Sequence, residues 1–416
     1  MKRRNFLKGL GAGAVAVAAP WGAVQAADDA YEGPLLITVN ALGGWDVTNF
    51  IDPKGNHLNR RYDVGDVETA GRIAYAPLDS NGAFLQRHHG EMLVINGIDM
   101  ATGGHVEGAR HAWSGDLADN GTPSLAALFA AAKTRELNLP APFISYGGFS
   151  RTGDLVPLTR LANPAVLQSI GNPATERGFP GSARYVDDFV VEEIYRARRA
   201  RHERQLALET LPRFKAQRST LFAAQLSAPA LRRYQDFLPT EDETRGFSNW
   251  QTSAVVTLAA MKAGIAASAS VYVSDFDTHS DHENRHQVKL EELLAAITTL
   301  IDRADQLDLL DRLTLVISSE FSRTPEYNGS GGKDHWPVNS MILMGPGIDG
   351  NRVVGSTDDA HLPRSLDLDT LEPNDGGERL RPAHLHSTLR EHLGIAEFGV
   401  ASGFDLRTRT LPLLRS

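Results

Sequence analysis

The sequence has no cysteine among its 416 residues, few aromatic residues, and fewer basic than acidic side chains. The lack of cysteine excludes a thiol nucleophile, an iron–sulfur cluster, thioether-linked haem and a thiolate zinc site. Any bound metal must therefore use histidine and carboxylate side chains. With 51 acidic against 42 basic residues, the chain as a whole is not complementary in charge to nucleic acid or to an anionic membrane.

The first 26 residues have the order of regions that is typical of an export signal. Met1 to Lys8 reads MKRRNFLK, which resembles a twin-arginine motif, and a run rich in glycine and alanine follows. This run is too short and too weakly apolar for a stable membrane span, and small residues near Ala26 offer a cleavage site. We expect residues 1–26 to engage the twin-arginine translocation machinery, and the mature protein to be periplasmic or otherwise exported.

Short apolar runs alternate with longer helical patterns after residue 30, which predicts an α/β fold with a mostly parallel sheet and helices on both faces. We expect strands at Leu35–Val39, Met92–Ile98, Phe143–Tyr146, Ala269–Val273, Thr314–Ser318 and Met341–Met344. We expect helices at Ser124–Lys133, Tyr185–Ala207, Asn249–Ala263, Val288–Ala304 and His384–Leu393. Residues 27–416 are interpreted as one domain, with a helical insertion or cap around 185–240 because mixed charges there recur at helical spacing.

Residues that can bind a metal follow most of the predicted strands. Open α/β sheets bind ligands at the carboxyl edge, where residues distant in sequence converge. The candidate metal ligands are Asp46, His105, Asp277, His279, Glu320, Asp334 and His335. Their oxygen and nitrogen donors suit one or two divalent ions, of which Zn, Mn, Mg, Ca and Fe are all admissible. The acidic, histidine-rich segment from Asp275 to His286 also has a competing interpretation, which is an exposed loop before the helix expected from Val288.

Spacing refines two of these assignments. In an extended chain Asp277 and His279 lie two residues apart and point the same way, so both can face one ion. Asp334 and His335 are adjacent and cannot both do so from a regular strand, although the glycine-rich turn before them relaxes this limit. His335 is the better ligand candidate, and Asp334 is either a second ligand or the partner that fixes the imidazole tautomer.

Several motifs together resemble domain-of-unknown-function family 1501. They are LGGWD (42–46), GGHVEGARHAWSG (103–115), DFDTHS (275–280), SEFSRTP (319–325), GGKDHWP (331–337), MGPGI (344–348) and GSTDD (355–359). That family is similar in fold to the alkaline phosphatase and sulfatase superfamily, so the resemblance implies a three-layer alkaline-phosphatase-like sandwich. It also implies that Asp46, Asp277, His279, Glu320 and His335 occupy metal-binding positions.

The resemblance leaves the nucleophile open. His105 falls where phosphatases and sulfatases carry their nucleophile, and neither serine nor cysteine stands there. Thr102 supplies the nearest hydroxyl, and His105 is a candidate ligand, general base or nucleophile. Arg323 and Lys333 flank the ligand candidates and could neutralise a phosphate or sulfate group.

These observations predict a metal-dependent hydrolase of a small anionic ester, with Thr102, His105 and Arg323 as catalytic candidates. The nucleophile would be either a metal-activated water or a hydroxyl group. The alternative is a non-catalytic metal-binding or envelope assembly protein on a degenerate phosphatase or sulfatase scaffold.

Overall fold

The computed structural model describes residues 30–54, 60–78, 80–137, 139–161, 183–211 and 228–414. The predicted export signal at residues 1–26 lies outside this described part of the chain. No helix in these ranges combines the length and the hydrophobicity needed to cross a lipid bilayer.

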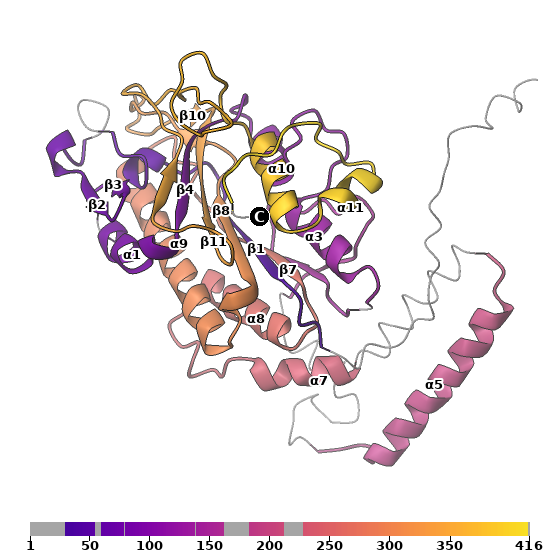
Figure 1. The fold of residues 1–416 in the computed structure, drawn as a ribbon. Helices are drawn as coiled ribbons and strands as arrows, with labels where there is room; N and C mark the ends of the chain where they lie inside the picture. Colours follow the sequence, from indigo (N-terminus) through magenta and orange to yellow (C-terminus); the bar gives the residue numbers. More distant parts are fainter. Residues whose placement is uncertain are drawn as a thin grey trace, which may run out of the picture.

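An eight-stranded sheet forms the centre of the described structure, in the order β12-β4-β11-β8-β1-β7-β5-β6 (Figure 1). Its strands are β1 (Leu35–Ala41), β4 (Leu93–Asp99), β5 (Phe143–Ser145), β6 (Leu158–Thr159), β7 (Ser268–Val273), β8 (Leu313–Ser318), β11 (Val338–Met344) and β12 (Arg352–Val354). Neighbouring strands run parallel except at β11, which is antiparallel to both β4 and β8. The mostly parallel sheet expected from the sequence is therefore confirmed, with one reversed strand inside it.

The central strands are apolar without alternation because helices cover both faces of the sheet. All seven residues of β1 are buried, as are all six of β8. In register, Val39 of β1 lies opposite Val271 of β7 and Ile317 of β8. This pairing aligns the carboxyl ends of the three strands at one edge of the sheet.

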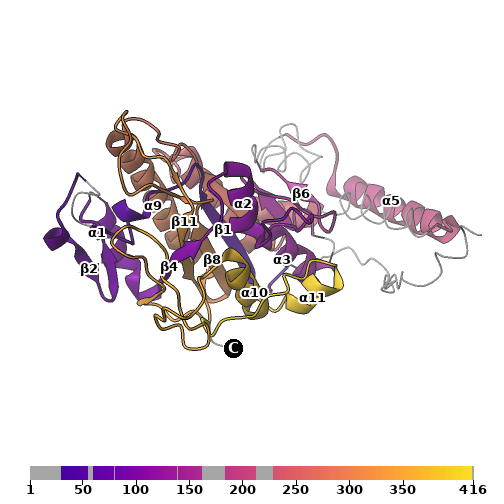
Figure 2. The same ribbon diagram turned by 90° about the horizontal axis from the view of Figure 1, so that it is seen from above.

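Two helical layers enclose the sheet, as Figures 1 and 2 show. The helices of the body are α1 (Asn81–His88), α2 (His105–Ser114), α3 (Leu125–Thr134), α7 (Ala228–Phe237), α8 (Asn249–Lys262), α9 (His282–Gln306), α10 (Pro382–His392) and α11 (Ala396–Ala401). Helices α8 and α9 pack together on one face, and α1 and α7 contact this pair. On the other face α3 packs on β1 and β7, and α10 packs on α2.

The predicted helix from Val288 begins earlier than expected. Helix α9 starts at His282, so only the end of the histidine-rich segment is helical, and Asp275 to Asp281 form the loop expected before it. His282 and His286 are fully buried there, one helical turn apart. Periodicity missed this start because the partners that bury these polar side chains come from the distant loop after β1.

Part of the predicted insertion around 185–240 is described. Helix α5 (Asp188–Leu208) lies apart from the two helical layers in both views, whereas α7 contacts α8 in the body. The stretch 212–227 between them lies outside the described residues.

Candidate metal centre

The loops after β1, β4, β7 and β8 meet at the carboxyl edge of the sheet. They carry Asp46, His105, Asp277 and Glu320, respectively. His335 reaches the same edge because β11 is antiparallel and begins there. It lies on β10 (His335–Trp336), which pairs with β9 (Ser322–Arg323). The reversed strand thus brings the glycine-rich turn at 329–332 to this edge of the sheet.

Three imidazoles and one carboxylate form a compact cluster in this position. The Asp277 Oδ1 atom lies 3.1 Å from His279 Nε2, 3.5 Å from His335 Nε2 and 3.7 Å from His105 Nε2. The Nε2 atoms of His279 and His335 are 3.1 Å apart. His105, Asp277 and His335 each offer a ligand atom within 4.8 Å of the others. The sequence candidates from three separate loops therefore converge.

Each imidazole in the cluster is oriented through its Nδ1 atom. His105 Nδ1 lies 2.9 Å from Glu320 Oε1, His279 Nδ1 lies 2.7 Å from Asp334 Oδ1, and His335 Nδ1 lies 2.7 Å from the Gly103 carbonyl oxygen. These oxygen acceptors place a proton on Nδ1 of each neutral ring, which leaves the Nε2 lone pair as the free donor. All three lone pairs belong to the atoms that gather around Asp277.

The charges at the cluster favour an ionised Asp277. Burial by itself would raise the pKa of Asp277, but the hydrogen bond and charge of Arg323, with His105 and His279, hold it below the ordinary value. Burial lowers the pKa of His335, with Arg323 and His105 acting in the same direction. The hydrogen bond and charge of Glu320 raise the pKa of His105 despite partial burial.

The imidazole rings of His105 and His335 pack against a buried phenylalanine. The buried Phe321 ring lies 4.9 Å from His105 and 4.5 Å from His335 between ring centroids. Gly108 on α2 allows the helix to approach the loop after β8, because a Cβ there would lie 2.7 Å from the Glu320 carbonyl oxygen. The cluster faces outward, with side-chain exposures of 27% for His335, 39% for His105 and 47% for Asp277.

Two predicted ligands act on the imidazoles instead. Glu320 is fully buried, and its Oε1 accepts hydrogen bonds from His105 Nδ1 and from the Gly43 amide. Asp334 accepts from His279 Nδ1 and from the Asn328 side-chain amide. In this arrangement both carboxylates fix imidazole tautomers. For Asp334 this corresponds to the second of the two roles considered from the sequence.

The structure does not bring Asp46 into the cluster. Its Oδ2 lies 2.6 Å from Lys333 Nζ and 3.0 Å from His282 Nε2, and its Oδ1 accepts from the Thr48 amide and hydroxyl. Asp46 and Lys333 are both fully buried. The Asp46 carboxylate is therefore already neutralised by an ammonium group.

Arg323 is placed differently from the sequence expectation. Its side chain is fully buried and donates to the carbonyl oxygens of Gly43, Gly44 and Lys333, and to Asp277 Oδ1 at 2.7 Å. A buried guanidinium held in this way cannot reach a substrate. Arg323 instead joins the loops after β1, β7 and β8 and supports the ionised state of Asp277.

The Thr102 hydroxyl lies beside the N-terminus of α2, where it accepts a hydrogen bond from the Gly104 amide at 3.1 Å. The next residue, Gly103, provides the carbonyl that orients His335. No hydrogen bond links the Thr102 hydroxyl to a base within the described part of the chain. The Glu107 carboxylate lies nearby, since a Cβ on Gly104 would be 2.4 Å from Glu107 Oε2 and 3.6 Å from Thr102 Oγ1.

His282 and His286 are functional candidates that the sequence reasoning did not select as ligands. Their rings stack at 4.7 Å between centroids, and His286 Nε2 accepts from the Asp46 amide at 2.7 Å. The signal available in the sequence was their spacing of four residues, which places two side chains on one helix face. A spacing of four places two side chains on one face only within a helix, so it could be interpreted only once the helix was known to begin at His282.

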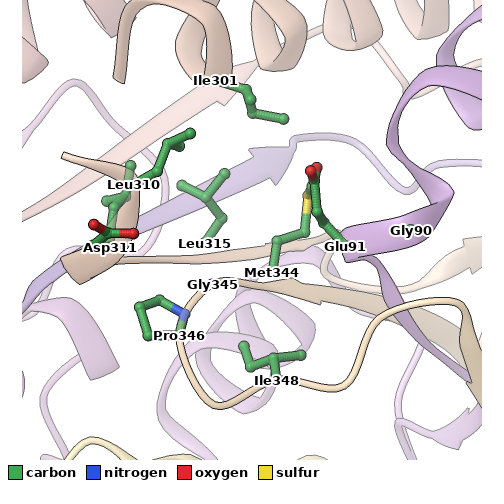
Figure 3. Close-up of a pocket in the computed structure, with 11 residues that line it drawn as sticks. Gly90, Glu91, Ile301, Leu310, Asp311, Leu315, Met344, Gly345, Pro346 and Ile348 are labelled. Atoms are coloured by element: carbon green, nitrogen blue, oxygen red, sulfur yellow. The ribbon is translucent and has the colours of Figure 1, made fainter. Parts of the chain in front are cut away.

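A cavity of about 360 Å³ opens at the opposite edge of the sheet (Figure 3). Leu315, Met344 and Ile348 line its apolar floor, with Glu91 and Asp311 at either side. It lies near the start of β8, whereas the imidazole cluster follows the end of that strand. The cavity is therefore separate from the candidate metal centre.

The sequence matches the family model described as a protein of unknown function, DUF1501, over residues 35–398. The chain belongs to the DUF1501 family. The match includes every residue of the imidazole cluster. No curated protein matches the sequence.

Several solved structures of hydrolases show a distant likeness. The alkaline phosphatase from the Antarctic bacterium TAB5 is 10% identical, over 76% of this chain and 93% of that chain, with a TM-score of 0.35. The phosphonate monoester hydrolase of Agrobacterium radiobacter is 13% identical, over 87% and 74%, with a TM-score of 0.33. A sulfatase from a Pseudoalteromonas species is 10% identical, over 79% and 66%, with a TM-score of 0.33. At these TM-scores the likeness carries no argument about the chemistry of this DUF1501 protein.

Proposed function

We propose that His105, Asp277, His279 and His335 bind a divalent metal ion, and that this DUF1501 protein is a metal-dependent hydrolase of an anionic ester. The single observation that carries the proposal is the common orientation of the three imidazoles. Each has its Nδ1 atom on an oxygen acceptor, and each directs its Nε2 atom toward the Asp277 carboxylate. Imidazole ligands in metal sites are oriented in the same way by carboxylates and carbonyls.

The donor set favours a borderline transition metal over a hard cation. Three imidazole nitrogens and one carboxylate oxygen match the preferences of Zn²⁺ and Fe²⁺, whereas Mg²⁺, Ca²⁺ and Mn²⁺ prefer oxygen ligands. A bound ion of this kind polarises an ester and lowers the pKa of a water molecule toward neutrality. The outward exposure of Asp277 and His105 gives a small substrate access to the site.

The chain's own residues perform three tasks in this proposal. Asp277 and the three imidazoles bind the ion, while Glu320, Asp334 and the Gly103 carbonyl hold the rings in the ligating tautomer. Arg323 keeps Asp277 ionised and ties its loop to the loop after β1. We propose water rather than Thr102 as the nucleophile, since among the described residues the hydrogen bond of that hydroxyl is with the Gly104 amide and not with a base.

A second candidate function is metal binding without turnover. It is favoured by the burial of Arg323 and Lys333, because each cation is already paired with a carboxylate of the protein and neither is exposed to the anionic group of a substrate. A metal-binding or envelope assembly protein would need no such contact. Hydrolysis therefore has to be measured separately from metal binding.

Elemental analysis of purified protein tests the site. We expect a bound divalent metal in the wild type and its loss in His335→Ala and Asp277→Ala. His89→Ala is a matched control, because it also removes an imidazole, one whose Nδ1 lies 3.1 Å from the Leu85 carbonyl oxygen rather than in the cluster. A folded wild type that binds no metal would refute the proposed site.

Assays with phosphate, sulfate and phosphonate esters of p-nitrophenol then test the reaction. We expect chelation to abolish hydrolysis and metal addition to restore it. Retained metal with no hydrolysis of any of these esters would support the binding protein instead. We also propose export, which fusion of residues 1–26 to a reporter tests, with Arg3→Lys/Arg4→Lys expected to block twin-arginine transport.

A further inference from the structure

A second polar cluster adjoins the metal-site residues and is sealed from solvent. It contains Asp46, Lys333, Thr48 and His282, each with at most 1% of its surface exposed. Arg323 connects the two clusters, because it donates both to Asp277 Oδ1 and to the Lys333 carbonyl oxygen. Both clusters therefore lie beneath the same edge of the sheet and share one loop framework.

The Lys333 ammonium lies at the centre of this second cluster. Its Nζ atom is 2.6 Å from Asp46 Oδ2 and 3.2 Å from Thr48 Oγ1. His282 Nε2 lies 3.0 Å from the same carboxylate oxygen. A carboxylate and a hydroxyl thus contact the positive charge, and an imidazole contacts the same carboxylate oxygen. These are donor types that divalent cations also accept.

Several bonds hold the surrounding groups in place. The Asp46 carboxylate accepts from the Thr48 amide and hydroxyl through its other oxygen, and the Thr278 hydroxyl lies 2.7 Å from His282 Nδ1. The Lys333 amide donates to the Thr278 carbonyl, which fixes the backbone from which the ammonium extends. The position of the cation is therefore built by the fold rather than by a mobile surface side chain.

We propose that the Lys333 ammonium occupies the place of a second divalent cation, so that the protein binds one metal ion per chain. This inference rests on the proposed function, since it assigns the stoichiometry of that metal centre. An ion placed on Asp46 Oδ2 would have to displace the ammonium or share one oxygen with it in a site without solvent. The buried ammonium repels a nearby dication and has no route to water, so neither arrangement is favourable.

The same geometry explains the different roles of the two carboxylates. Asp277 accepts from Arg323 through Oδ1, but it also faces three imidazoles and its side chain is 47% exposed, so solvent screens that pair and an ion can reach the carboxylate. Asp46 faces a tethered cation and has both oxygens engaged. Lys333 and His335 are separated by one residue, so a single turn supplies a cation to one cluster and a ligand to the other.

Counting bound metal in matched variants tests this inference. Metal-free protein is titrated with Co²⁺ or Zn²⁺, and the bound ion is measured by elemental analysis after gel filtration. We expect one equivalent in the wild type, two in Lys333→Ala, and one in Lys333→Ala/Asp46→Asn. The double variant is the control, because it removes the ammonium and the carboxylate charge that would bind the second ion.

The possible counts separate this inference from the proposed function. Two equivalents in the wild type would overturn the inference, as would a folded Lys333→Ala protein that still binds one. No equivalent in a folded wild type would refute the metal centre itself. Should Lys333→Ala fail to fold, the wild-type count still decides, with one equivalent supporting the inference and two refuting it.

Discussion

Glu320→Gln is a sharp test of how the imidazoles are positioned. Glu320 is fully buried, and its Oε1 accepts from His105 Nδ1 at 2.9 Å and from the Gly43 amide at 2.8 Å. Its Oε2 lies 3.1 Å from the Ser319 hydroxyl oxygen, which can accept a hydrogen bond from a glutamine NH₂. Glutamine therefore fits the same space and keeps an oxygen toward His105, so the substitution removes mainly the negative charge.

The expected effect is weaker metal binding without unfolding. Loss of a carboxylate partner behind a ligating histidine typically costs about 10- to 100-fold in metal affinity, which corresponds to roughly 1.4–2.7 kcal/mol. The pKa of His105 should fall, since Glu320 raises it in the wild type. With a lower pKa, His105 in the variant is less often protonated at pH 6, so protons compete less with the metal there and offset part of the affinity loss. The loss relative to wild type is therefore expected to be larger at pH 8 than at pH 6.

Competition with a chromophoric chelator at both pH values measures this change. Glu326→Gln is the matched control, because it makes the same charge change at an exposed position six residues along the chain. A Glu320→Gln affinity within twofold of wild type, with the fold intact, would refute the orienting role of the carboxylate. An equal loss in Glu326→Gln would instead assign the effect to general charge.

Three further perturbations follow from the geometry. Lys333→Met should lower the unfolding free energy by about 3–5 kcal/mol, because it leaves the buried Asp46 carboxylate without its cation. Lys333→Met/Asp46→Asn should recover much of that loss, because it also removes the carboxylate charge. Additive losses in a double-mutant cycle, measured by denaturant unfolding, would contradict this prediction. Gly332→Ala should abolish metal binding, because a Cβ at Gly332 would lie 1.9 Å from a backbone carbon. Gly329→Ala should not, because a Cβ there meets no atom within 4 Å. Equal metal content in the two variants would contradict this prediction. His386 is fully buried, and burial lowers its pKa to about 3. Below about pH 6.5 the unfolded chain binds a proton at this residue that the folded chain does not, so acidification should lower the unfolding free energy by up to about 1.4 kcal/mol per pH unit. Denaturant titrations from pH 6.5 to 4 measure this dependence. A His386→Gln variant whose unfolding free energy depends on pH as steeply as that of the wild type would contradict the prediction.

Local pattern was sufficient for six of the eight sheet strands, all but the short β6 and β12, and for helices α3, α5, α8, α9 and α10. The apolar runs at β1, β7 and β8 are continuous because both faces of these strands are buried, which makes them recognisable without knowledge of their partners. Helix α2 was not predicted, since its sequence includes glycine and histidine and its packing against α10 stabilises it. The reversed direction of β11 also has no local signature, because strand direction depends on pairing.

The candidate site was likewise predicted from the sequence only in part. Positions after strand ends marked His105 and Asp277, and the turn before the last predicted strand marked His335; the structure brings the three within 4.8 Å of one another. The sequence could not separate ligands from orienting groups, because glutamate and aspartate can do both. Burial and hydrogen-bond partners assign Glu320 to the orienting group and remove Asp46 from the cluster.

The sequence by itself determined the donor chemistry: without cysteine, any metal must bind histidine and carboxylate, and these residues follow strands of an α/β sheet. Only the tertiary structure decided which donors face solvent and which face Lys333. The physical reason is that ligand chemistry belongs to the residue type, whereas the partner of each oxygen and nitrogen depends on chain segments hundreds of residues apart. Asp46 and Asp277 have the same carboxylate, and the fold gives one a buried ammonium ion and the other a guanidinium, three imidazoles and access to solvent.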